Sequence, residues 1–224
     1  MTKEVYVIVE GQTEEQFVKK VLAPYLNHQQ IYLKPIVLQT SRIQRGGGVN
    51  KDRFLRHVSN TLKMQRSIVT SMIDLYGLSK NFPGCDQLKP EMSGNQKADI
   101  IEACLHQAVV EYTNCRSDRF IPYVQPYEYE ALLFSDIDQL VQVEPGWSHA
   151  KYVTALQAIV NQFETPEQIN GQRDTLPSNR LHQILTPTYR KVRHGPLIAQ
   201  RITIPVLAEK CHHFAAWIQK LSTL

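Results

Sequence analysis

The chain has 224 residues, of which 42% are apolar and 21% are charged. These proportions are those of an ordinary globular protein and exclude a disordered chain, and the length allows one enlarged domain. The sequence contains no apolar run of the roughly 18 residues that a membrane helix needs, and its N-terminus does not resemble a signal peptide. We therefore expect a cytoplasmic protein without a membrane partner.

The first elements are predicted to be a strand, a tight turn and a helix. Residues 4–9 are a β-branched run typical of a buried parallel strand, and Glu10 follows directly. Apolar residues then recur at helical spacing over residues 17–26, with a kink or break expected at Pro24.

The start of this helix carries polar residues that suit a helix N-terminus. Thr13 and Gln16 have the spacing of a capping box, in which each side chain bonds the backbone of the other residue. Glu14 and Glu15 in the first turn suit the positive end of the helix dipole.

The alternation of strands and helices continues along the chain. Further strands are predicted at residues 31–38, 67–73 and 120–124, and helices at residues 51–66, at 96–112 and from 130–134 onward. A glycine run at residues 46–48 marks a loop. This order predicts an α/β fold with a mostly parallel sheet flanked by helices. We expect one structural unit, with an α/β core at residues 1–147 and a helical C-terminal extension at 148–224.

Acidic residues follow several of the predicted strands. Glu10 follows the first strand, Asp74 the third, and Glu128 and Glu130 the fourth. Ligands of parallel sheets bind at the carboxyl ends of the strands, and carboxylate oxygens suit Mg²⁺ or Mn²⁺. Because Glu128 and Glu130 are two residues apart, a strand would place both on one face, whereas a helix would not. The sequence leaves open which of the two faces the site.

Two short motifs carry a family resemblance, and four further segments narrow it. Val9–Glu14 reads V-E-G-Q-T-E and Met72–Gly77 reads M-I-D-L-Y-G; the further segments are 127–136, 177–180, 191–196 and 211–214 with Trp217. In this order they resemble a Toprim-like bacterial family of domains of unknown function (family 4276), related to the Toprim nucleases of OLD-type phage-defence systems. The resemblance covers almost the whole chain.

The resemblance implies a Toprim-like (Rossmann-like) fold and a metal-dependent nuclease. Glu10, Asp74, Glu128 and Glu130 are the expected metal ligands, and Glu10, Asp74, Glu130 and Lys191 the expected catalytic residues. The Toprim motif carries D-x-D, whereas Tyr76 stands at the second acidic position here, which puts two-metal catalysis in doubt. The resemblance also implies an ABC-type ATPase partner, and the chain itself has no P-loop.

The positive charge of the chain is unevenly distributed. The net charge is +4, and basic residues gather in two stretches, with Arg42, Arg45, Lys51, Arg53 and Arg56 in one and Arg173, Arg180, Arg190, Lys191, Arg193 and Arg201 in the other. Such clusters favour polyanionic partners, here DNA or RNA. We expect Arg180, Lys191, Arg193 and His194 to contact nucleic acid.

Two other functions remain open from the sequence. The first is a non-catalytic module that binds nucleic acid or a partner protein, which Tyr76 in place of an aspartate favours. The second is phosphotransfer or nucleotide chemistry on a small substrate.

The cysteines and the histidine pair near the C-terminus carry little functional signal. The four cysteines form no C-x-x-C pair, and we expect free, mostly buried thiols. His212 and His213 follow Cys211, but adjacent residues on a helix point about 100° apart and seldom share an ion. Packing with Phe214 and Trp217 is the preferred interpretation.

Overall fold

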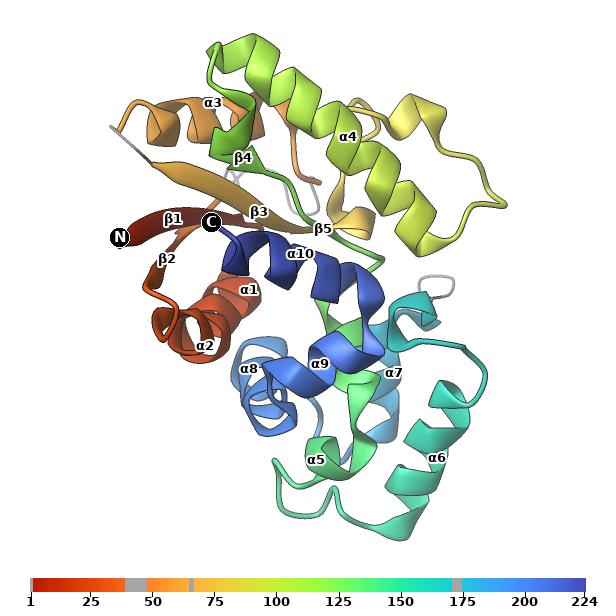
Figure 1. The fold of residues 1–224 in the computed structure, drawn as a ribbon. Coiled ribbons are helices and arrows are strands. Elements are labelled where there is room, and N and C mark those ends of the chain that lie inside the picture. The colour runs from red at the N-terminus through yellow and green to blue at the C-terminus, as the bar shows by residue number, and fades with distance from the viewer. Residues whose placement is uncertain (1, 39–47, 65–66, 171–174) are drawn as a thin grey trace.

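The computed structural model describes residues 2–38, 48–64, 67–170 and 175–224. Its centre is a parallel sheet in the order β2-β1-β3-β4, with a short fifth strand, β5, pairing with β3 (Figure 1). The strands are β1 (Lys3–Val9), β2 (Ile31–Val37), β3 (Ile68–Asp74), β4 (Phe120–Ile121) and β5 (Val124–Gln125). The predicted α/β class with a mostly parallel sheet is confirmed.

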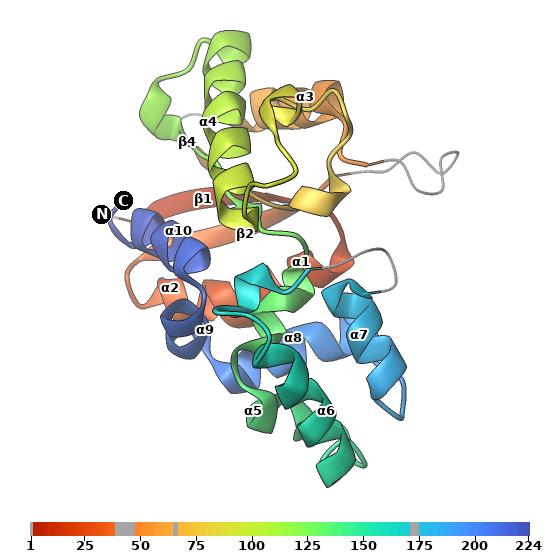
Figure 2. The ribbon, with the colours of Figure 1, turned by 90° about the vertical axis from the view of Figure 1, so that its right-hand side faces the viewer.

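Helices cover both faces of the sheet. They are α1 (Gln12–Phe17), α2 (Ala23–Asn27), α3 (Lys51–Leu62), α4 (Gly94–Thr113), α5 (Ile137–Val141), α6 (Ala150–Val160), α7 (Pro177–Ile184), α8 (Lys191–Ile202), α9 (Ile204–Lys210) and α10 (His212–Ser222). Helices α3 and α4 lie on one face, and α1, α2 and α10 lie on the other (Figures 1 and 2). Helices α5 and α6 lie farthest from α3 and α4 in both views. None of the described helices has the length and apolar composition that a bilayer crossing requires.

The alternation of side chains along β1 explains why it lies inside the sheet. Val5, Val7 and Val9 join the hydrophobic core on the side of α1 and α10, whereas Ile8 joins the core on the side of α3 and α4. All four side chains are completely buried. Successive side chains of a strand point to opposite faces, so a continuous β-branched run fits a strand that is covered on both sides.

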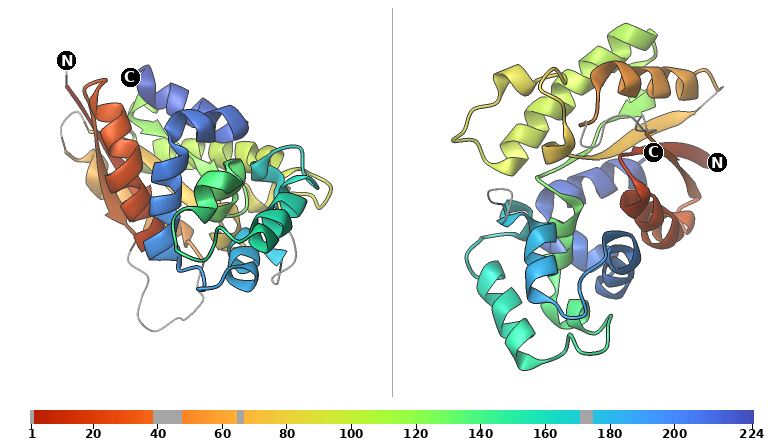
Figure 3. Two further views of the ribbon diagram at one scale, coloured as in Figure 1. Left: turned by 90° about the horizontal axis from the view of Figure 1, so that it is seen from below. Right: turned by 180° about the vertical axis from the view of Figure 1, so that it is seen from behind.

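Helix α10 returns the end of the chain to the sheet (Figure 3). The Trp217 indole N–H donates to Thr70 Oγ1 of β3 over 2.8 Å, and its ring stacks on Tyr123 with centroids 4.2 Å apart. Both rings are almost fully buried. The C-terminal helices therefore share one hydrophobic core with β1 and α1.

Pro122 explains why the predicted fourth strand is broken into β4 and β5. Proline has no N–H to donate to a ladder, so the strand stops at Ile121 and resumes at Val124. Across the gap the hydroxyl of Ser71 donates to the Tyr123 carbonyl over 3.0 Å and accepts from the Tyr123 N–H over 2.9 Å. A side chain thus replaces the missing ladder bonds.

Two helical predictions need correction. The helix does not break at Pro24: a π-helical turn at Val18–Leu22 precedes the proline, and the backbone stays helical to Asn27. A π turn lets the helix continue through Pro24, which has no N–H to donate to the helical ladder. The helix expected from Glu130 is a 3₁₀ segment, Tyr129–Ser135.

Some predicted features lie outside the described residues. These are Gly46 and Gly47 of the glycine loop and the basic residues Arg42, Arg45 and Arg173. The helix predicted to run to Arg66 ends earlier, at Leu62. All four cysteines are free, and Cys211 is buried, but Cys85, Cys104 and Cys115 are partly exposed rather than buried.

Candidate functional site

Two predicted acids meet because their strands are neighbours. Strands β1 and β3 pair in parallel with Val9 opposite Met72, so Glu10 and Asp74 leave the sheet at the same edge. The backbone N–H of Asp74 donates to Glu10 Oε2 over 3.4 Å. The N–H of Tyr129 donates to Asp74 Oδ1 over 3.0 Å, which brings the segment with the other two acids to this edge.

Glu128 and Glu130 both face this site, and Lys191 of α8 lies between them. Lys191 Nζ is 3.7 Å from Glu128 Oε1 and 3.3 Å from Glu130 Oε2. Glu128 is extended, at the residue just before the 3₁₀ segment that contains Glu130. Neither the strand rule nor the helix rule applies across that boundary, which is why the sequence left the choice open.

Neighbouring elements fix the orientation of these two carboxylates. The N–H and the hydroxyl of Ser178, in the first turn of α7, donate to Glu128 over 3.1 and 3.3 Å. The hydroxyl of Tyr189 donates to Glu130 over 3.3 Å. The segments 177–180 and 191–196 thus supply Ser178 and Lys191, and Tyr189 lies just before the second segment.

Glu14 is a fifth acid of the site, and the sequence analysis missed its role. Helix α1 begins two residues earlier than predicted, with Gly11 as its N-cap, and Glu14 Oε2 accepts from the Gly11 N–H over 3.0 Å. The expected box between Thr13 and Gln16 is therefore wrong. Glu14 is buried, and its charge acts on Glu10 and Asp74. Its place in the V-E-G-Q-T-E motif, four residues after Glu10, was the available signal.

Gly77 allows the Glu10 carboxylate to lie against the loop after β3. A Cβ at Gly77 would overlap the Glu10 carboxylate. The loop is a single 3₁₀ turn, Leu75–Gly77, so its backbone approaches the acid closely. A side chain at position 77 would therefore displace the Glu10 carboxylate from its present position.

Four acids of the site, Glu10, Glu14, Asp74 and Glu130, hold their protons more strongly than exposed acids do. Burial, followed by the charges of Glu14 and Glu10, raises the pKa of Asp74 well above its ordinary value. Burial also raises the pKa of Glu10 and of Glu14, each opposed in part by Lys191. Burial raises the pKa of Glu130 to about 7, although Lys191 lowers it. The positive charge that the protein supplies is therefore too small to keep these buried carboxylates as readily ionised as exposed ones.

Lys191 is the basic residue that offsets part of this charge. The nearby carboxylates of Glu130, Glu128 and Asp74 raise the pKa of Lys191 against the effect of its burial, so the ammonium stays charged. Among the described residues, Lys191 is the one lysine or arginine that lies within ion-pair distance of any of the five acids, and it pairs with Glu128 and Glu130.

The other predicted contacts to nucleic acid have different partners. Arg193 donates to Glu144 over 2.8 Å, and the buried His194 lies 3.2 Å from the same carboxylate and accepts from the Arg190 N–H. Arg180 donates to the carbonyls of Thr175 and Asn170. Arg193 and His194 thus tie α8 to the loop after α5, and Arg180 ties α7 to the segment before it. Within the described part of the chain, none of the three forms an ion pair with the five acids.

The donor set of the sheet edge fits Mg²⁺ or Mn²⁺. All five donors are carboxylates, which hard cations prefer, and a divalent cation would offset the charge that Lys191 leaves. The oxygens are not closed around one point: among the described residues, the group whose ligand atoms lie within 4.8 Å of one another is Asp99, Glu102 and His213. Mg²⁺ usually keeps several waters and takes one or two carboxylates directly, so wider spacing suits it.

The second group, Asp99, Glu102 and His213, is explained by internal pairing. His213 Nε2 is 2.8 Å from Glu102 Oε1, and Nδ1 is 3.5 Å from Asp99 Oδ1, so both ring nitrogens face carboxylates. Glu102 Oε1 also accepts from the Val124 N–H over 2.8 Å. Burial alone would lower the pKa of His213, but the carboxylate of Glu102, together with the charges of Glu167 and Asp99, raises it. This group joins α4 and α10 and does not involve Cys211 or His212.

Comparison with known proteins places the chain in a family. Residues 9–222 match the family described as "Domain of unknown function (DUF4276)". The chain belongs to this family. No curated protein and no solved structure matches the chain. The match covers the two N-terminal motifs, the segment 127–136 and Lys191, so all five acids of the site lie within the family domain.

Replacing Glu130 should change how stability depends on pH. Its pKa is about 7 in the folded protein against an ordinary value of 4.5, so between these values the folded state binds a proton that the unfolded chain has released. Glu130 thus leaves the free energy of unfolding unchanged below about pH 4.5. As the pH rises to about 7, it lowers that free energy by on the order of 1–3 kcal/mol. As the pH rises from about 5 to about 8, the free energy of unfolding measured in urea should fall less for Glu130→Gln than for wild type.

The exposed Glu209 on α9 offers a matched control for this measurement. Glu209→Gln should keep the pH dependence of the wild type. If the free energy of unfolding changed with pH in the same way for wild type and Glu130→Gln, the pKa of Glu130 would not be raised.

Proposed function

We propose that this protein is a metal-dependent phosphodiesterase of the nuclease type, with its active site at the carboxyl edge of the sheet. The observation that carries the proposal is the gathering of five carboxylates at one edge of the sheet, two of which pair with Lys191. Buried, mutually repelling acids are costly to a fold and cluster at functional sites. Phosphodiester hydrolysis uses such acids to hold divalent cations beside the scissile phosphate.

The arrangement assigns a task to each side chain. Asp74 and Glu10, joined through the Asp74 N–H, are the ligands for Mg²⁺ or Mn²⁺ on the sheet, with Glu128 and Glu130 opposite. When bound, the cation lowers the pKa of a coordinated water and offsets charge on the phosphate. Lys191, charged and placed between two acids, stabilises the leaving oxygen or a phosphate oxygen. Glu130, with its pKa of about 7, is suited to accept a proton from the attacking water near neutral pH.

A role in phage defence, with an ABC-type ATPase as partner, extends this proposal. It is supported by the resemblance to the nucleases of OLD-type systems. The chain has no P-loop, so ATP hydrolysis would come from the partner. DNA and RNA both present the phosphodiester that the acidic site requires.

A non-catalytic module that binds nucleic acid is the second candidate. Two observations favour it: Tyr76 replaces the second aspartate of the resembled motif, and the five acids are not closed around one ion position. In that case Lys191 would neutralise the acids permanently, and the site would only help to hold the fold together.

Metal binding separates the two acidic groups of the molecule. Wild type should bind Mn²⁺, and Asp74→Asn should bind it about tenfold more weakly or not at all, because it removes one anionic ligand. Asp99→Asn, in the group of Asp99, Glu102 and His213, is the matched control and should bind like wild type. Titration calorimetry measures all three. Loss of binding in Asp99→Asn but not in Asp74→Asn would move the metal site to the other group.

Cleavage should depend on Glu10 and on the partner. We expect weak or absent cleavage by the isolated chain and stronger cleavage with the ATPase, because a delivered phosphate adds oxygens to the metal shell. Glu10→Gln should abolish it while the protein stays folded, since Glu10 lies at the rim of the sheet. The assay uses plasmid, single-stranded DNA and tRNA with Mg²⁺ or Mn²⁺. Cleavage that survives Glu10→Gln places the active site elsewhere, and its absence under every condition favours the binding module.

A further inference from the structure

Two adjoining cavities lie directly beside the acidic site. They have volumes of about 430 and about 620 Å³, and both are lined by Tyr76, Pro90, Lys97 and Tyr127. These volumes fall in the range of pockets for small organic groups. Tyr76 is two residues after Asp74, and Tyr127 directly precedes Glu128, so the chain itself connects the cavities to the acids.

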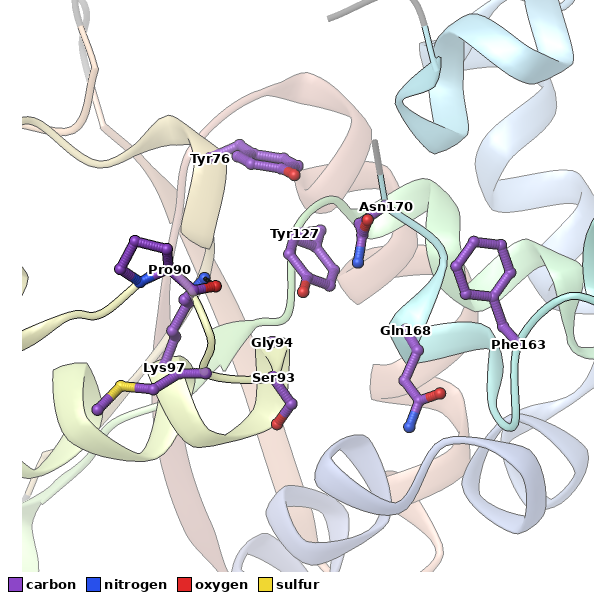
Figure 4. Close-up of a pocket in the computed structure, with 10 residues that line it drawn as sticks. Tyr76, Pro90, Ser93, Gly94, Lys97, Tyr127, Phe163, Gln168 and Asn170 are labelled. Atoms are coloured by element: carbon purple, nitrogen blue, oxygen red, sulfur yellow. Dashed lines mark hydrogen bonds between the residues drawn. The ribbon is translucent and has the colours of Figure 1, made fainter. Parts of the chain in front are cut away.

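The cavities are built around a pair of tyrosine rings. The ring centroids of Tyr76 and Tyr127 are 5.2 Å apart with 38° between the planes, and both rings line the smaller cavity (Figure 4). Tyr76 is 46% exposed, whereas Tyr127 is nearly buried beneath it. A partly exposed aromatic ring that is supported by a second ring is suited to stacking with a planar group.

Two features of the backbone hold the Tyr127 ring in this place. Tyr127 has a φ of +62°, a left-handed conformation that a bulky residue seldom adopts. Gly94 at the start of α4 lets the ring approach, because a Cβ there would lie 2.6 Å from Tyr127 Cε2. Strain of this kind persists where the surrounding structure enforces it, and it clusters at binding sites.

Basic residues surround the open ring. Lys80 and Lys89 lie in the loop between β3 and α4 and are exposed, and Lys97 lies on α4. All three line the larger cavity, whereas the acids of the same loop, Asp86 and Glu91, line neither. A cavity lined by an aromatic ring and three lysines combines base stacking with attraction to phosphates. Proteins bind single-stranded nucleic acids through this combination.

We propose that the Tyr76 pocket binds an unpaired base of single-stranded DNA or RNA and so positions the neighbouring phosphate at the acidic site. A paired base offers only its edge to a protein, so stacking on Tyr76 requires a base that has left its partner. Lys80, Lys89 and Lys97 hold the backbone on either side of that base. The positioning of the phosphate at the acidic site rests on the proposed function, but the test of base binding does not require cleavage.

The test measures binding in EDTA, so that cleavage plays no part. A fluorescently labelled single-stranded 12-mer of thymidines serves for anisotropy, and a 12-mer with one 2-aminopurine reports stacking through quenching. Tyr76→Ala should weaken binding about 5- to 100-fold and abolish the quenching, whereas Tyr76→Phe, which keeps the ring, should retain both. Replacing Lys80, Lys89 and Lys97 together should make the slope of log K against log salt shallower by about 2.

The controls distinguish this inference from the proposed function. Tyr112 on α4 is 55% exposed and lines neither cavity, so Tyr112→Ala should bind like wild type. Asp74→Asn should keep Tyr76-dependent binding even if it abolishes cleavage. Equal affinity of wild type and Tyr76→Ala, equal binding of duplex and single strand, or no binding by wild type would each overturn the pocket assignment. Tyr76-dependent binding without cleavage under any condition, with the ATPase included, would leave the pocket assignment intact and refute the nuclease.

Discussion

The burial of negative charge at one edge of a parallel sheet is the constraint on which this site depends. Parallel strands end at the same edge, so β1 and β3 bring Glu10 and Asp74 together regardless of what else the chain does. Each further acid raises the cost of ionising the others, since burial removes the water that would screen them. The protein answers with donors from its own backbone, at Asp74 and Tyr129, and with Lys191. Under the proposed function, a divalent cation would offset the charge that these groups leave uncompensated.

The positions of the acids on the sheet were predictable from the sequence, and the local geometry around them was not. A strand followed by an acid is enough to place Glu10 and Asp74, because the rule concerns strand direction and no side-chain detail. Glu14 was missed because its role depends on where α1 begins. With Thr13 as N-cap, Glu14 faces only the helix dipole; with Gly11 as N-cap, it folds back over that turn and joins the acids. A shift of two residues, within the usual error of helix ends, changes its function.

The basic stretch on α8 shows a second limit of sequence reasoning. Lys191 and Arg193 look equivalent in the sequence, but two residues on a helix point about 200° apart. Lys191 therefore reaches the acids, whereas Arg193 reaches Glu144, which is 49 residues away along the chain. A local charge count cannot reveal such a distant partner. The charge of a stretch indicates the class of ligand only when every long-range pair is known.

The loop after β3 explains what Tyr76 does in a position where the resembled motif has an acid. Residues 75–77 form a 3₁₀ turn, and the Tyr76 ring is exposed and lies against Tyr127, whereas Asp74 is half-buried. Meanwhile Glu14 and the pair Glu128 and Glu130 bring carboxylates from other elements. Carboxylates from other elements thus gather at the edge where the resembled motif has its second acid, and position 76 carries an aromatic ring two residues after Asp74.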